Sequence, residues 1–184
     1  PFVKHLTVRL SGNRLLADAL CGARDARHDL PMLRRATFLS AYGEGWALYA
    51  EKLAQEMGVY ADDPIAEIGY LQSSLFRSGR LVVDTGMHAM GWSREKAIET
   101  MTSIDGSPTS AATTEIERYS VWPGQACSYM VGKLTWLRLR EKARAALGPR
   151  FDIRQFHDAG LLSGAMPLTV LEAVIDTYIA SNKA

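Results

Sequence analysis

The sequence predicts an all-α fold. Apolar residues recur at helical spacing along most of the chain, no segment shows the sustained alternation of a half-buried strand, and glycine, proline and capping residues divide the chain at short intervals. Hydrophobic residues make up 47% of the 184 residues and charged residues 22%, which is typical of a chain that folds around a core. We therefore expect a multi-helix bundle of roughly six to eight helices.

Local signals place the helices of the first half. Gly58 would end one helix through a left-handed backbone, Pro64 would open the next because its missing N–H is not needed there, and Ser93 is a candidate N-cap. The helices are expected over residues 13–27, 36–57, 64–90 and 93–103, the first on a weak pattern.

The second half is divided mainly by prolines. Trp122 precedes Pro123 and so should end one helix, while Pro123 should start the next. Asp152 is a candidate N-cap. We expect helices over residues 110–121, 123–147, 152–162 and 168–180, and we divide the chain into a weakly patterned segment 1–29 and a helical domain 30–184.

Composition excludes several classes of function. A net charge of +1 provides no overall field that would attract nucleic acid or an anionic membrane, and no apolar run is long enough to span a bilayer. Cys21 and Cys127 stand far apart and form no metal-binding pair. With no signal peptide in the chain, the prediction is a cytoplasmic protein without nucleic-acid or membrane partners.

One predicted helix interior contains two glycines, Gly43 and Gly45, on either side of Glu44. Each costs about 1 kcal/mol relative to alanine, so the pair needs a reason. Close helix packing beside the ring of Trp46 would supply one. Alternatively, Glu44 and Glu51 lie on one helix face and could act as a metal ligand and its supporting carboxylate.

A polar stripe follows on the next predicted helix, formed by Arg77, Arg80, Asp84 and His88 at spacings of three and four residues. In the simplest interpretation the stripe is solvated or internally paired, for example between Arg80 and Asp84. Alternatively, His88 and the arginines face a cleft and bind substrate.

Gln125 and Tyr129 stand one turn apart near the helix start expected at Pro123. A phenol and an amide there could hydrogen-bond a polarised carbonyl, since a helix N-terminus favours negative charge. Buried tyrosine and glutamine side chains are equally common as structural bridges.

Four sequence blocks carry a resemblance to a known family. The bacterial domain-of-unknown-function 885 family, whose members look like zinc metallopeptidases, is similar to this chain over about residues 30–179. The blocks are YGEGWALYAE at 42–51, RLVVDTGMH at 80–88, ERY at 117–119 with WPGQA at 122–126, and FHD at 156–158.

The resemblance implies a fold and a set of roles. That family resembles helical zinc peptidases of the gluzincin type, in which two histidines and a downstream glutamate bind zinc and polarise the scissile carbonyl. By similarity Glu44 would be the downstream zinc ligand and Tyr129 the catalytic phenol that stabilises the oxyanion. Arg118 or Gln125 would hold a peptide or other small-molecule substrate, and the polar stripe adds His88 as a further substrate-binding candidate.

The chain departs from the family at its metal motif. The H-E-x-x-P-G-H-H segment would fall near residues 11–18, which read SGNRLLAD. Because catalytic zinc needs about three protein ligands, Glu44 alone should not hold the metal tightly. We expect the C-terminal segment of a zinc metallopeptidase-like hydrolase, beginning at Pro1 after a missing N-terminal portion and inactive by itself. The alternatives are a non-catalytic helical module that binds a ligand or partner, and residues constrained by folding alone.

Overall fold

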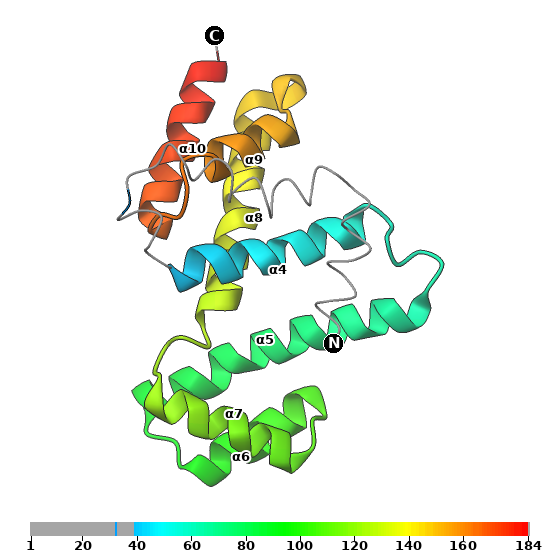
Figure 1. The fold of residues 1–184 in the computed structure, drawn as a ribbon, viewed down its shortest axis with the longest axis vertical. Coiled ribbons are helices and arrows are strands. Elements are labelled where there is room, and N and C mark those ends of the chain that lie inside the picture. Colours follow the sequence, from blue (N-terminus) through cyan, green and yellow to red (C-terminus); the bar gives the residue numbers. More distant parts are fainter. Residues whose placement is uncertain (1–31, 33–38, 184) are drawn as a thin grey trace. The chain divides into compact units, whose positions relative to one another are not determined.

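The computed structural model describes Met32 and residues 39–183, in which all the regular structure is helical (Figure 1). The all-α prediction is confirmed for these residues. The helix predicted over 13–27 and the first residues of the one predicted over 36–57 lie outside the described residues. None of the described helices is both long and apolar enough to cross a membrane. The elements are α4 (Ser40–Glu56), α5 (Pro64–Met90), α6 (Arg94–Asp105), α7 (Thr109–Val121), α8 (Ser128–Leu147), η2 (Gly148–Arg150), α9 (Ile153–Leu161) and α10 (Leu168–Asn182).

Helix ends agree with the sequence where a local cap sets them. Helix α5 begins at Pro64, as predicted, and the side chain of Asp63 accepts a hydrogen bond from the backbone N–H of Ala66 at 3.0 Å. It ends at Gly91, whose φ of 64° is left-handed. The predicted cap Ser93 accepts from the backbone of the next helix, α6.

The prediction that a helix starts at Pro123 is wrong. Helix α8 begins at Ser128, and the preceding residues form hydrogen-bonded turns. Gly124 has a φ of 77°, a left-handed backbone that cannot continue a right-handed helix. Gln125 therefore lies in a turn before α8 and not in its first turn.

The structure divides into two compact units. Ser40–Trp136 form one unit, and the described residues from Leu137 onward belong to the other, so the residues of α8 are shared between them. All the residues singled out as candidates for function lie in the first unit.

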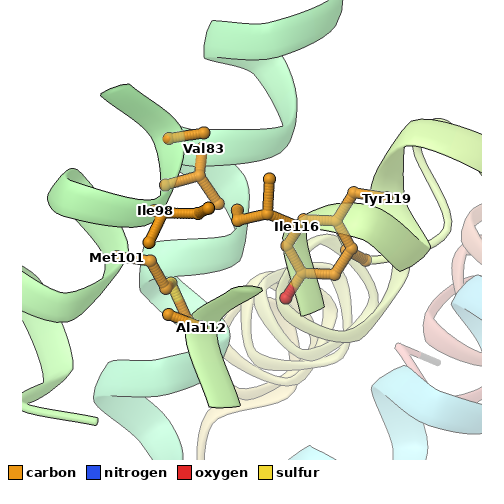
Figure 2. Packing of buried hydrophobic residues seen from close by; sticks show 8 residues of the cluster. Val83, Ile98, Met101, Ala112, Ile116 and Tyr119 are labelled. Atoms are coloured by element: carbon orange, nitrogen blue, oxygen red, sulfur yellow. The ribbon is translucent and has the colours of Figure 1, made fainter. Parts of the chain in front are cut away.

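In the first unit, α6 and α7 pack against α5 around an apolar cluster (Figures 1 and 2). Val83 of α5 and Ile116 of α7 are fully buried there, and Tyr119 closes one end (Figure 2). Burial of such side chains contributes about 1.5–3 kcal/mol each, so this cluster holds the second half of α5 and all of α7 in register. Its buried members are Val83, Ala97, Ile98, Met101, Ala112, Ile116, Tyr119 and Ala126.

Helix α4 meets the first half of α8 at two glycines. A Cβ atom added to Gly45 would overlap the backbone of Gly132, and one added to Gly132 would overlap the carbonyl of Ala41. The close-packing interpretation of Gly45 is confirmed, although the partner is the backbone of α8. The ring of Trp46 lies edge-on to Trp136 at 4.9 Å between centroids.

Gly45→Ala and Gly132→Ala are each expected to lower the free energy of unfolding by about 2–4 kcal/mol, because backbone cannot move aside as a side-chain tip can. The double variant should lose less than the sum, since both changes act on one contact. Gly79→Ala is the control: its nearest neighbour is the flexible Met101 Sδ at 3.1 Å. Urea unfolding followed by circular dichroism compares these four variants with the wild type. Equal losses of unfolding free energy for Gly45→Ala and Gly79→Ala would contradict the assigned contact.

The second unit contains α9, α10 and the rest of α8. Phe156 of α9 and Leu171 of α10 are fully buried, and Asp152 caps α9 as predicted. Burial lowers the pKa of His157 to about 4, and the positive charge of Arg140 acts in the same direction. His157 is therefore neutral in the folded unit at pH values above about 4.

Stability should fall as the pH drops from 6.5 to about 4, because the unfolded chain binds a proton at His157 in that window and the folded chain does not. The expected loss is about 2–3 kcal/mol. His157→Gln should flatten this dependence, whereas His88→Gln, at an exposed position, should keep it. Urea unfolding at a series of pH values tests this, and parallel curves for wild type and His157→Gln would refute it.

Candidate functional site

Glu44 and Tyr129 are brought together by the packing of α4 on α8. The hydroxyl of Tyr129 donates a hydrogen bond to Oε1 of Glu44 at 2.8 Å, and both side chains are partly buried. Gly45 and Gly132 make this possible, since each lies within one turn of the pair and lets the two backbones approach. The two residues predicted as metal ligand and catalytic phenol therefore share one hydrogen bond.

Glu115 of α7 is the centre of a second group. Its Oε2 accepts hydrogen bonds from Arg80 and Arg118, both at 2.9 Å, and from the hydroxyl of Tyr119 at 2.8 Å. Burial by itself would raise the pKa of Glu115, but the hydrogen bonds from Arg118 and Tyr119 and the charges of the two arginines outweigh it and lower the pKa. Glu115 is thus held ionised between two guanidinium groups.

Arg118 and Gln125, the predicted substrate-binding residues, contact each other. Nη1 of Arg118 donates to the side-chain oxygen of Gln125 at 2.7 Å, and the Gln125 amide nitrogen lies 3.4 Å from the hydroxyl of Ser40. The polar ends of both predicted residues therefore have partners within the protein. A ligand that binds either residue directly must compete with these contacts.

The polar stripe of α5 is divided among different partners. Arg80 is 6% exposed and pairs with Glu115, so the predicted pair between Arg80 and Asp84 is wrong. Asp84 is 3% exposed and accepts from the backbone N–H of Gly124 at 3.1 Å and 3.2 Å. The carboxylate of Asp84, by accepting the N–H of Gly124, fixes the turn before α8. Arg80 is then paired with Glu115 of α7.

His88, the third predicted substrate-binding residue, lies at an exposed position near the end of α5. Its Nε2 is 3.1 Å from the backbone carbonyl oxygen of Tyr119. No hydrogen bond joins it to Arg77 or Arg80 among the contacts of the described residues. The structure places it beside the end of α7.

Glu51, two turns along α4 from Glu44, faces cations. Burial raises its pKa, and the charges of Arg77 and Lys133 oppose that rise. Lys133 is 7% exposed and donates to the hydroxyl of Ser74 at 3.2 Å, while burial lowers its pKa. Glu51 thus lies in a partly buried cluster of charged side chains.

The described residues contain no group of three or more histidine, cysteine, aspartate or glutamate side chains placed to hold a metal ion. Glu44 is the one predicted ligand among them, and it already accepts from Tyr129. Because a catalytic zinc site needs about three protein ligands, the donor set in this part of the chain does not fit a zinc ion. The residues at 11–18, where the family motif would fall, lie outside the described residues.

The family model described as "Bacterial protein of unknown function (DUF885)" matches residues 21–175. The chain belongs to this family. Every candidate residue discussed above lies within the matched range. Among curated proteins, none matches the chain.

A solved structure extends the comparison of this DUF885 chain. The chain is 48% identical to a protein whose structure is described as "The crystal structure of the putative lipoprotein from Colwellia psychrerythraea", with a TM-score of 0.82. The likeness covers 84% of this chain and 26% of that chain. The chain thus spans about a quarter of the length of this relative.

Sequence reasoning passed over Glu115, the most connected carboxylate of the DUF885 site. Its three partners come from two helices, and the partner Arg80 lies on α5, far away in sequence. A local signal was present, because Glu115, Arg118 and Tyr119 are spaced three and four residues apart and must share a helix face. That spacing identifies the pairs within α7 but not the buried arginine.

Glu115→Gln is expected to lower the free energy of unfolding by about 2–4 kcal/mol, because it leaves the buried charge of Arg80 without its anion. Glu117→Gln is the matched control, since Glu117 lies two residues away and pairs with the exposed Arg94. The wild type should also lose stability as the pH falls through the lowered pKa of Glu115, and the variant should lose less. Equal urea midpoints for the two variants would refute the central role of Glu115.

Proposed function

We propose that this chain is the C-terminal, substrate-positioning part of a zinc metallopeptidase-like peptide hydrolase. The observation that carries the proposal is the hydrogen bond of 2.8 Å between Tyr129 and Glu44, with Arg80 beside the same phenol ring at 4.9 Å. A phenol hydroxyl and a guanidinium group are the kinds of donor that stabilise negative charge on a substrate oxygen. The family resemblance supports the choice of reaction.

The roles of the chain's own residues follow from their contacts. The hydroxyl of Tyr129, which donates to Glu44 in the structure, would serve as the hydrogen-bond donor to a substrate oxygen. Arg118 and Gln125 hold each other at 2.7 Å and support the wall of the site. Because the donor set does not fit zinc, the metal-dependent step is assigned to the part of the enzyme beyond the described residues.

A non-catalytic ligand-binding module is the second candidate. One observation favours it: buried guanidinium nitrogens of Arg77 and Arg80 have no hydrogen-bond partner. The described residues also hold no metal-binding group that would point to catalysis. Such donors suit recognition of an anion without any chemistry. The option that folding alone constrains Glu44 and Tyr129 is disfavoured, because the two side chains converge on each other from different helices.

The place of action is part of the proposal as well. The cytoplasmic prediction rests on the cysteine pattern. The relative from C. psychrerythraea is described as a "putative lipoprotein", which supports an envelope location for that protein. Under this proposal the present chain meets its substrate in the same compartment as that relative, and this replaces the cytoplasmic prediction.

The reaction class is tested by comparing the 184-residue chain with the protein from C. psychrerythraea. Both are stripped with a chelator, dialysed against zinc, analysed for bound metal, and incubated with a peptide mixture that is read by mass spectrometry. We expect the relative to retain about one zinc per chain and to cleave peptides, and the 184-residue chain to do neither.

Two results would overturn the proposal. Tight stoichiometric zinc with cleavage by the 184-residue chain would show that its own residues complete a site. A relative that binds no zinc and cleaves no peptide would remove the hydrolase assignment and leave the binding module.

A further inference from the structure

Arg80 is a buried cation with spare hydrogen-bond donors. Its side chain is 7% exposed, and its ion pair with Glu115 uses Nη2 alone. The buried Nε and Nη1 atoms have no hydrogen-bond partner. A buried donor of a charged group is costly to leave without a partner, so each such donor in a native structure calls for an explanation.

Arg77 lies one turn earlier on α5 and has the same deficit. Its Nε is buried without a partner, and within the described part of the chain no ion pair involves it. Burial lowers the pKa of Arg77, and the charge of Arg80 lowers it further, while Glu51 acts in the opposite direction. Two guanidinium groups therefore repel each other in a partly desolvated place.

Aromatic rings cover the faces of both guanidinium groups. The Cζ of Arg80 lies 4.4 Å from the ring centroid of Phe76 and 4.9 Å from that of Tyr129. The Cζ of Arg77 lies 4.9 Å from Phe76 and 5.6 Å from Tyr129. Stacking on rings stabilises a cation but satisfies none of its N–H groups, which point outward in the guanidinium plane.

The carboxylates already present are committed elsewhere. Glu115 accepts from Arg80, Arg118 and Tyr119, and Glu44 accepts from Tyr129. Glu51 interacts with Arg77 through its charge without a direct ion pair between them among the described contacts. One further anion could accept from unpaired N–H groups of these arginines and would offset the repulsion between them.

We propose that Arg77 and Arg80 bind the carboxylate of a ligand, next to the Glu44–Tyr129 pair. A planar carboxylate fits the guanidinium edge through two parallel hydrogen bonds, and the ring of Tyr129 bounds the site. The inference rests on the proposed function only in taking the ligand to be a peptide. In a peptide the carboxylate is either the C-terminus or an acidic side chain.

Binding is measured on the metal-free 184-residue chain with three probes that are not cleaved in the assay. They are N-acetyl-alanyl-alanine, its C-terminal amide, and N-acetyl-aspartyl-alanine amide, which keeps only a side-chain carboxylate. NMR of the arginine Nε–H groups reports on the guanidinium groups directly. We expect the free acid to shift the Arg77 and Arg80 signals with saturation and the alanyl amide to shift neither. The aspartyl probe decides between the two sources of the carboxylate.

Arg77→Gln should weaken binding of the acid by about ten- to hundredfold, because it removes a charge-assisted hydrogen bond. Arg77→Lys should recover only part of this, since lysine lacks the planar fork. Arg94→Gln is the control: this exposed arginine pairs with Glu117 in the same unit and should leave binding unchanged. Arg77 is preferred to Arg80 for the test because, among the residues that the structure describes, it takes part in no ion pair that would be lost.

The inference is overturned if the acids and the amide behave alike, if no probe shifts the Arg77 and Arg80 signals, or if Arg77→Gln binds the acid as the wild type does. These outcomes are separable from failure of the hydrolase proposal. The titration needs neither zinc nor cleavage. If the proteins cleave no peptide but the 184-residue chain binds carboxylates, the hydrolase proposal fails and the carboxylate site stands. If the relative is active but the 184-residue chain binds no carboxylate, only the carboxylate site fails.

Discussion

The backbone contact between Gly45 and Gly132 is the constraint on which the candidate site depends. With any larger residue at either position, α4 and the first half of α8 would move apart, and Glu44 would lose its hydrogen bond to Tyr129. Two helix-interior glycines lower the stability of their helices by about 2 kcal/mol relative to alanine. The packing that they permit, which includes the contact of Trp46 with Trp136, offsets this cost. The site is thus built on a rigid crossing of two helices and not on a loop.

Around this crossing the protein brings two guanidinium groups close together, because Arg77 and Arg80 both lie over the rings of Phe76 and Tyr129. Glu115 compensates Arg80 and Arg118 together, whereas burial and the charge of Arg80 both lower the pKa of Arg77. Repulsion between partly desolvated cations is costly in a folded chain at rest. It becomes useful when a ligand brings a negative charge, because part of the binding free energy then comes from relief of repulsion already present.

The sequence predicted those parts of the fold that local chemistry decides. Asp63, Ser93 and Gly91 act within a few residues of themselves, so the bounds of α5 and the start of α6 could be predicted. The helix start predicted at Pro123 was wrong because the next residue, Gly124, has a left-handed backbone conformation. Asp84 of α5 holds Gly124 by a hydrogen bond to its N–H. The resemblance assigned separate roles to Glu44 and Tyr129 but did not predict their hydrogen bond. The link from Arg80 to Glu115 could not be predicted either, because it joins two helices through tertiary packing.

The bond from Gly124 to Asp84 also affects how mutational data on this protein should be interpreted. Among the described residues no hydrogen bond or ion pair joins Asp84 to Glu44, Arg77 or Arg80, yet Asp84 fixes the turn from which α8, and with it Tyr129, starts. In a screen for loss of function, substitutions at Asp84 would resemble those of a residue in the site itself. Structural and functional positions in this family can therefore be told apart only when folding and binding are scored on the same variants.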